Sequence, residues 1–487
     1  MSSSSLKDKT ANALLWGGIN NGAQQVLNLV FGIFLARLLS PADYGMVGML
    51  TIFSLIATSL QESGFISGLN RKKDITDADY NAVFWFNVLC SSGVYVILFF
   101  CAPLIAAWYR QPVLVPLARL SFLTFVISSL GTSPRAWLFR NMKVRETALL
   151  TLGALTVSGI CGVCLAFNGF AFWGIAIQNL VYCTMMSLGS WWFSGWHPSW
   201  HINLQPLRGM IGFSSKILAT NIFTHINNNI FSIFFGRLYG EKTVGYYNQA
   251  NKWTTMGSNT LVGMLWSVTQ PLFARFDKND LERMQRVFRK LLRFTAFLSC
   301  PALFGLALIA PEFITIAITE KWMTSAHLMQ VLCIGGAFMP VSSFYANFVI
   351  SQGKSNIFMW NTVVLCLAQM LLLIILYPYG VEAMVIAYVV VNTLWLFVWH
   401  WFVKRLIGVR FWHALRDVIP FALIAAVAMA AGWGMAQLSG GNLYLSLLLK
   451  IVGAVIAYVL LLRLLGAEIL NECTEFVKSK IPFRRKA

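Results

Sequence analysis

The chain has 487 residues, of which 57% are hydrophobic and only 11% are charged. Soluble domains carry about 25% charged residues, so this composition excludes a soluble globular protein. The net charge is +19, but no polar stretch is long enough to fold as a basic nucleic-acid-binding domain, and we predict no nucleic-acid partner.

Apolar runs of about 20 residues, separated by short polar breaks, recur from Ala11 to Leu465. This pattern is typical of helices that cross a hydrocarbon layer about 30 Å thick. We predict an all-α polytopic membrane protein with about fourteen transmembrane helices, the first of which is too long and too polar for a cleavable signal. The predicted spans are 11–36, 44–66, 80–107, 113–134, 147–167, 170–193, 209–236, 245–271, 294–318, 325–350, 357–377, 382–403, 417–437 and 443–463.

The loops between these spans are unequally charged. If the N-terminus is cytoplasmic, about 29 cations lie on the inner side, and the outer side carries Arg37, Arg110, Arg237, Lys242 and Lys321. Short cytoplasmic loops are enriched in Lys and Arg. We therefore predict a multi-pass protein with both termini in the cytoplasm.

The first and seventh predicted spans are related in sequence. With a shift of 200 residues and no gap, eight of 25 positions are identical, from the pair Asn21 and Asn221 to the pair Gly45 and Gly245. Helices one to six and seven to twelve therefore form two six-helix lobes in a parallel pseudo-two-fold repeat. We predict an N-terminal lobe (1–206), a C-terminal lobe (207–410), and two extra helices with a basic cytoplasmic tail (411–487).

Two polar stripes at repeat-related positions lie within the first and seventh spans. They consist of Asn21, Gln25 and Asn28, and of Asn221, His225 and Asn228. Such side chains either hydrogen-bond neighbouring helices or face a cavity. Because a symmetry axis would place both stripes at one interface, we favour a central cavity. Lobes of this kind are typical of alternating-access transporters, and a channel or a duplicated scaffold is the alternative.

Cations also occur inside the predicted spans. Arg119 and Lys252 would each cost at least about 2.5 kcal/mol facing lipid, so we expect both to face water or an anion. Lys216 could serve the cavity entrance or snorkel to the interface, and Lys450 is interpreted as snorkelling or peripheral. Most carboxylates lie in loops, and Glu312 is placed toward the end of its span. A cationic membrane core favours an anionic, phosphate-bearing substrate over an organic cation or a carboxylate proton relay.

The sequence contains no recognisable motif for catalysis, metal binding or cofactor binding. The chain has no H-E-x-x-H, no G-x-S-x-G and no paired carboxylates at membrane depth. Cys161 and Cys164 form a C-x-x-C inside an apolar run without a second ligand pair, which favours packing over zinc or redox chemistry. We predict neither catalysis nor a cofactor or metal.

A basic segment joins the eighth and ninth spans. Between Leu281 and Leu292, apolar residues at helical spacing are interleaved with Arg and Lys. This pattern suits an amphipathic helix on an anionic inner leaflet, and a topology signal explains it nearly as well. The tail from Lys478 to Lys486 has the same character, so anionic membrane lipids are predicted partners.

Several segments together resemble one protein family. Residues 34–45, FLARLLSPADYG, resemble the "LARxLsPxdfG" signature of the polysaccharide-transporter branch of the multidrug/oligosaccharidyl-lipid/polysaccharide exporter superfamily. Residues 244–250, VGYYNQA, resemble that family's "vGyYnrA". Further matches are residues 270–275 with the basic run that follows, Lys321–Trp322 and residues 350–354. The resemblance covers essentially the whole chain.

This resemblance implies a flippase that moves oligosaccharide on a polyprenyl diphosphate lipid, a lipopolysaccharide, capsule or exopolysaccharide precursor, to the outer leaflet of a bacterial plasma (inner) membrane. It implies two lobes around a cationic cavity, two further helices bordering a groove for the lipid tail, and other polysaccharide-assembly membrane proteins as partners. The family often has a basic residue where Gln249 stands, so Lys252 could supply that charge from another turn. The alternatives are a small-molecule exporter of the multidrug branch, disfavoured by the lack of core carboxylates, and a membrane glycan ligase or polymerase.

Overall fold

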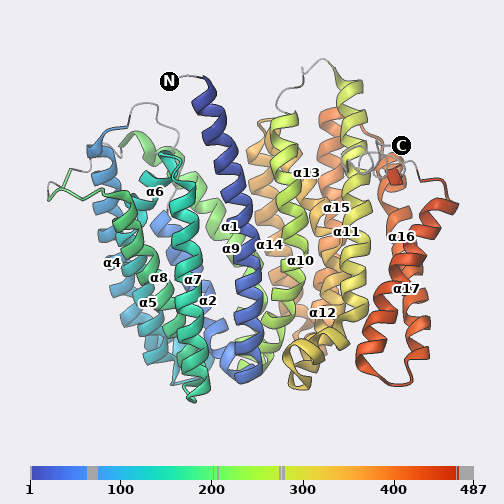
Figure 1. Cartoon of the computed structure of the whole chain (residues 1–487), viewed down its shortest axis with the longest axis horizontal. Helices are drawn as coiled ribbons and strands as arrows, with labels where there is room; N and C mark the ends of the chain where they lie inside the picture. The colour runs from blue at the N-terminus through green and yellow to red at the C-terminus, as the bar shows by residue number, and fades with distance from the viewer. Residues whose placement is uncertain are drawn as a thin grey trace, which may run out of the picture. The chain divides into compact units, whose positions relative to one another are not determined.

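The structure is a computed structural model that describes residues 3–62, 75–200, 208–273 and 280–467, with short pieces at 202–203, 205, 276 and 469–470. All regular elements within these residues are helices (Figure 1). The chain forms two compact units, Met1–Asn248 (unit 1) and Gln249–Ala487 (unit 2). Unit 1 extends beyond residue 206 because α9, the first helix of the second repeat copy, packs against α2. The division at 206 and 410 expected from the repeat stays a prediction.

Unit 1 contains eight helices and the beginning of a ninth among the described residues. They are α1 (Ser3–Leu38), α2 (Pro41–Glu62), α4 (Asp77–Tyr109), α5 (Leu114–Leu130), α6 (Thr132–Arg140), α7 (Val144–Phe167), α8 (Ala171–Ser194), α9 (Arg208–Leu238) and the first turns of α10 (Glu241–Phe273).

Capping residues in the sequence explain where two of these helices begin. Ser40 precedes α2, and its main-chain N–H and Oγ donate to the Asp43 carboxylate at 2.8 and 2.6 Å. Thr76 and Asp79 form a reciprocal capping box at the start of α4. These contacts satisfy main-chain N–H groups that a helix leaves unpaired at its N-terminus.

The predicted span 113–134 is broken in the structure. Helices α5 and α6 meet at Gly131 with a bend of 44°. A Cβ at Gly131 would lie 2.9 Å from Cα of Ser187 on α8, so the close approach of α8 requires glycine here. Arg135 donates from Nε to the Gly131 carbonyl at 3.1 Å and from Nη2 to the Ser128 carbonyl at 3.0 Å, which pairs carbonyl groups at the break.

Unit 2 continues α10 and adds the remaining helices. They are α11 (Leu281–Ile318), η2 (Glu320–Trp322), α12 (Met323–Gly336), α13 (Met339–Ser351), α14 (Ser355–Leu376), η3 (Tyr377–Tyr379), α15 (Val381–Ile407), α16 (Phe411–Ala436), η4 (Gln437–Ser439) and α17 (Leu443–Leu464).

The basic segment from Leu281 to Leu292 is the beginning of α11. Its apolar residues Met284, Phe288 and Leu292 are at most 2% exposed and pack into the core of unit 2. The Phe288 ring contacts the rings of Phe344 and Phe348, with centroid distances of 4.9 Å to each. The interpretation as a helix lying on the membrane surface is therefore wrong, because protein covers the apolar face that would have entered the bilayer.

The number of spans agrees with the sequence. Ten helical segments of the described residues are long and apolar enough to cross a bilayer, and eleven if the broken pair α5–α6 is one span. The three other predicted spans correspond to α1, α9 and α10, which are 36, 31 and 33 residues long. The prediction of an all-α polytopic protein with about fourteen spans is confirmed.

Candidate functional site

The polar stripe of α1 lies on an open surface of unit 1. Asn21, Gln25 and Asn28 are all exposed. Helix α1 packs closely against α7, because a Cβ at Gly159 of α7 would meet the ring of Phe31 on α1. Amide side chains at this depth need water, another polar group or a ligand. The exposure of the stripe is consistent with a cavity-lining role, which stays a prediction.

The corresponding stripe of α9 is less exposed. Asn221 and His225 are half-buried, whereas Asn228 is exposed. Asn229 adjoins the stripe and donates from Nδ2 to the main-chain carbonyl of His225 at 3.0 Å. Lys216 belongs to α9, but its side chain lies outside those that the structure describes. Both stripes therefore lie in unit 1. The helices that carry them have different packing partners, since α1 packs against α7 and α9 packs against α2.

Arg119 lies near the beginning of α5 and rests on α4. Its guanidinium carbon is 4.1 Å from the centroid of the Phe99 ring, and its Nε donates to the Phe99 carbonyl at 3.5 Å. A cation–π contact of this kind stabilises the guanidinium charge within the membrane-spanning part of the chain. The two Nη groups do not take part in this bond, so they remain the part of Arg119 that could meet an anion.

Lys252 lies on the part of α10 that belongs to unit 2. It is half-buried, and its Nζ is 5.6 Å from the centroid of the Trp253 ring. That ring is fixed by an edge-to-face contact with Phe313 at 5.1 Å. Because Arg119 and Lys252 belong to different units, a common binding site for them stays a prediction.

The structure overturns the interpretation of Lys450 as a snorkelling residue. Lys450 Nζ lies 2.6 Å from Glu312 Oε1, and both residues are only 8% exposed. Ser446 Oγ donates to the same carboxylate oxygen at 3.0 Å, and Lys450 Nζ also donates to the Leu308 carbonyl at 3.2 Å. Lys450 therefore does not snorkel, and Glu312, which lies toward the end of α11 as predicted, is buried. Opposite charges within apolar runs are a sequence signal for an ion pair, but the sequence does not identify which two residues form it.

A cavity of about 340 Å³ lies beside this ion pair, between α11, α16 and α17. These three helices adjoin one another in unit 2 (Figure 1). Small side chains open the cavity, and its apolar lining includes Ala302, Gly305, Ala425, Ala428 and Ala454. Lys450 and Tyr458 also line it, and their spacing of eight residues on α17 corresponds to about 12 Å. The cavity is therefore an apolar slot with a polar group toward each end.

Two prolines inside α11 explain why side chains from other helices bond to its main chain. Proline has no N–H, so Pro301 leaves the carbonyl of Phe297 without its helical partner, and Pro311 does the same for Ala307. The Tyr458 hydroxyl donates to the Phe297 carbonyl at 3.0 Å. Gln330 Nε2 on α12 donates to the Ala307 carbonyl at 3.4 Å. Tyr458 and Lys450 together fasten α17 to α11 along the cavity.

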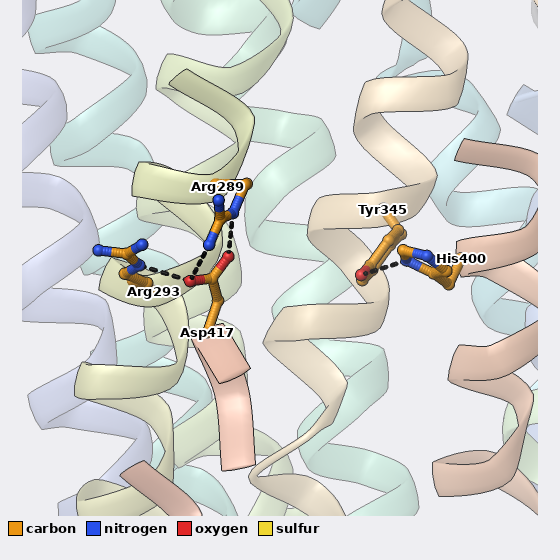
Figure 2. A network of polar contacts seen from close by, with 5 residues as sticks. All are labelled: Arg289, Arg293, Tyr345, His400 and Asp417. Carbon is orange, nitrogen blue, oxygen red and sulfur yellow. Dashed lines mark hydrogen bonds and ion pairs between the residues drawn. The ribbon is translucent and has the colours of Figure 1, made fainter. Parts of the chain in front are cut away.

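A second buried carboxylate fastens α16 to α11, as Figure 2 shows. Asp417 is 1% exposed and accepts hydrogen bonds from Arg289 Nε at 2.7 Å and Nη2 at 3.1 Å. Arg293 Nε donates to the same carboxylate at 2.5 Å. In the same view, the hydroxyl of Tyr345 lies 3.2 Å from Nδ1 of His400. Asp417 is not among the residues predicted from the sequence, although it follows an Arg-rich loop at the start of a predicted span.

Comparison with known proteins agrees with this architecture. Residues 34–327 match the family described as polysaccharide biosynthesis protein. The chain is 24% identical over 359 residues to the lipopolysaccharide biosynthesis protein WzxC of Escherichia coli (strain K12), which covers 72% of each chain. It is 21% identical over 420 residues to the teichuronic acid biosynthesis protein TuaB of Bacillus subtilis (strain 168), covering 85% of this chain and 87% of TuaB.

Solved structures show the same fold. The lipid II flippase MurJ in an inward closed conformation aligns with a TM-score of 0.71 and 14% identity, over 93% of this chain and 99% of MurJ. An inward-facing multidrug resistance MATE family transporter of the MOP superfamily aligns with a TM-score of 0.62 and 15% identity, over 83% of this chain and 95% of the transporter. The chain is thus a multi-pass membrane protein with a transporter fold. It belongs to the polysaccharide biosynthesis protein family, whose model matches residues 34–327.

Proposed function

We propose that this protein is an alternating-access flippase for polyprenyl-diphosphate-linked oligosaccharide, the precursor of a lipopolysaccharide, capsule or exopolysaccharide. It moves this lipid from the cytoplasmic to the outer leaflet of a bacterial plasma membrane, with both termini in the cytoplasm. The observation that carries the proposal is the apolar slot between α11, α16 and α17. An apolar lining of this kind favours burial of a hydrocarbon tail.

The charged and sugar-bearing parts of the substrate have separate binding groups in this proposal. Arg119 and Lys252 hold the diphosphate, because Arg and Lys supply the donors that phosphate oxygens accept. The stripes of α1 and α9 hydrogen-bond the sugar hydroxyls, and Lys216 lies at the cytoplasmic entrance. The name of WzxC, a lipopolysaccharide biosynthesis protein, supports this substrate class.

The lipid tail occupies the slot during this movement. Apolar surface of a polyprenyl chain is favourably transferred into an apolar lining, and the small residues on α11, α16 and α17 leave room for it. The contacts of Asp417, Lys450 and Tyr458 keep the three helices together around the slot. Anionic membrane lipids and other polysaccharide-assembly membrane proteins are further proposed partners.

The buried Glu312 does not favour the alternative of a small-molecule exporter for organic cations. Its carboxylate is already paired with Lys450 at 2.6 Å, so the pair carries no net negative charge for a cation to bind. Asp417 is likewise paired with Arg289 and Arg293. The described carboxylates at these two positions therefore belong to contacts between helices of unit 2.

Reconstitution into liposomes tests the proposed function. A polyprenyl-diphosphate oligosaccharide labelled on its sugar is placed in one leaflet, and its exposure in the other is followed with a membrane-impermeant sugar-modifying reagent. We expect crossing that depends on the protein and is absent from protein-free liposomes. Equal rates with and without protein, at zero potential and under an ion gradient, would reject the proposal. Ethidium transport by the same vesicles would support the multidrug alternative.

A further inference from the structure

The contact between α11 and α16 leaves positive charge uncompensated. Arg289 and Arg293 share one buried carboxylate, that of Asp417, and both donate to its Oδ1. Two guanidinium groups and one carboxylate, which we call the arginine cluster, retain a net positive charge. Among the described residues, Nη1 of Arg289 and both Nη groups of Arg293 have no hydrogen-bond partner. These two side chains are 28% and 41% exposed, so an anion can reach the unused donors.

The spacing of charges along the helices gives the depth of the arginine cluster. After Arg293, α11 has no charged residue until Glu312. The 18 residues between them correspond to about 27 Å of helix, which is close to the hydrocarbon thickness of a bilayer, about 30 Å. On α16, no charged residue follows Asp417 up to the end of the helix at Ala436. The cluster therefore lies at one edge of the apolar part of both helices.

The residues around the arginine cluster differ on its two sides. Towards the helix beginnings, Arg286 on α11 and Arg416 on α16 are exposed cations. Towards the apolar parts, Phe294 is 36% exposed and Ile419 is 40% exposed. A soluble anion would match only the cations. A lipid that carries a phosphate next to hydrocarbon chains would match both kinds of neighbour.

We propose that the arginine cluster binds the phosphate of an anionic phospholipid of the bilayer, with Arg293 as its main ligand. The guanidinium fork matches phosphate oxygens in geometry and charge. A zwitterionic lipid also has a phosphate, but its own cation offsets that charge, so the uncompensated charge of the cluster favours an anionic lipid. The inference develops the anionic-lipid partner of the proposed function and rests on that function for the leaflet, which is the cytoplasmic one. Bound lipid would neutralise the cluster and stabilise the contact of α16 with α11.

Arg293→Gln tests the site and keeps the contact between the helices, because Asp417 retains both hydrogen bonds from Arg289. Purified protein is titrated with phosphatidylglycerol or phosphatidylcholine, and native mass spectrometry counts the bound lipids. We expect the wild type to prefer phosphatidylglycerol and the variant to bind it about fivefold more weakly, with phosphatidylcholine binding unchanged. Arg293→Lys keeps the charge and should restore most of the binding.

Lys354→Gln is the matched control, since it removes an exposed cation elsewhere in unit 2, and it should bind phosphatidylglycerol like the wild type. Equal binding of phosphatidylglycerol by the wild type and Arg293→Gln would overturn the inference. An equally large loss in Lys354→Gln would also overturn it, because the attraction would then come from net charge alone.

A competition experiment distinguishes the bilayer lipid from other sources of phosphate. Polyprenyl diphosphate or inorganic phosphate is added to protein loaded with phosphatidylglycerol. We expect polyprenyl diphosphate to bind beside the phospholipid, because its proposed ligands Arg119 and Lys252 belong to α5 and α10. Displacement of phosphatidylglycerol by polyprenyl diphosphate would assign the cluster to the substrate, and displacement by inorganic phosphate would assign it to a soluble anion; either result rejects the inference. Selective phosphatidylglycerol binding by a protein that flips no lipid would reject the proposed substrate and support this site.

Discussion

The ion pair of Lys450 with Glu312 is almost fully buried, since both residues are only 8% exposed. Each charge alone would be costly there, and the two are held by a short contact with added bonds from Ser446 and to the Leu308 carbonyl. A buried pair contributes little net stability compared with apolar residues, but breaking it leaves an uncompensated charge. The pair therefore affects the free energy of unfolding mainly when one of its two residues is replaced.

The first prediction concerns this pair. Glu312→Ala leaves the Lys450 ammonium buried without its counter-charge, so we expect a loss of about 3–5 kcal/mol in unfolding free energy. Thermal unfolding in detergent, followed by size-exclusion chromatography, measures the resulting fall in Tm. The double variant Glu312→Leu with Lys450→Met removes both charges and should recover most of the loss. A single variant as stable as the wild type would contradict the assigned pairing.

The second prediction concerns the proposed diphosphate ligands. Replacing Arg119 and Lys252 together by Ala removes two cations, and we expect protein-dependent flipping to be lost while the amount of protein in the membrane stays normal. Liposome flipping and immunoblotting of membranes measure these two quantities. Lys354→Ala, in an exposed turn, is the matched control because it removes a cation elsewhere. Retained transport in the double variant would exclude both residues from an essential role.

Single residues also show what the sequence could and could not predict. Repeated positions identified the stripes of α1 and α9, since period and repeat are properties of the sequence. The partner of Lys450 could not be derived in this way, because it depends on which face α17 turns toward α11. The same holds for Arg119, whose contact with Phe99 depends on the packing of α5 against α4.

Among the helices, α11 contributes to the core, to the ion pairs with Asp417 and to a membrane span. Its sequence alone does not distinguish these roles. Its first turns carry a basic, amphipathic pattern, and in the structure that pattern packs into the core and contributes Arg289 and Arg293 to Asp417. Amphipathicity alone does not distinguish a helix that lies on a membrane from one whose apolar face is covered by protein. The break between α12 and α13 was also not predicted within span 325–350, although Pro340 at the start of α13 was a signal for it.

The third prediction tests how α16 is attached. Asp417→Ala leaves the guanidinium groups of Arg289 and Arg293 without their buried acceptor, so we expect the beginning of α16 to loosen from α11. Hydrogen exchange of residues 411–424 should become faster in detergent or nanodiscs, and Tm should fall. Glu282→Ala, at an exposed position in the first turn of α11, removes a carboxylate outside this contact and is the control. Unchanged exchange in α16 would contradict the anchoring role.

For the whole molecule, the sequence predicted the helix count, the all-α class and the family, because the length of apolar runs and the residues of short motifs are local features. The slot between α11, α16 and α17 emerges only from packing. Its residues are spread over three helices and share nothing more specific than small size. The sequence could suggest a groove only through resemblance to a family.

The fourth prediction uses the slot to separate tail binding from sugar binding. A Cβ at Gly305 would meet no atom within 4 Å, so Gly305→Leu can extend into the slot without displacing the backbone. We expect slower flipping of a full-length polyprenyl substrate and nearly normal flipping of an analogue with a short tail. Gly153→Leu on α7, where space is also open, is the control. Equal inhibition of both substrates would place the lipid tail elsewhere.

The attachment of α16 and α17 has a consequence for how such a chain could arise. A protein ending after α15 would leave Glu312, Arg289 and Arg293 without the partners they have here, together with the Phe297 carbonyl that Tyr458 now satisfies. A stable twelve-helix version of this chain would therefore need substitutions on α11 that remove its unpaired buried charge. In a chain truncated after Ile407, we expect Glu312→Leu with Pro301→Ala to raise the Tm measured in detergent.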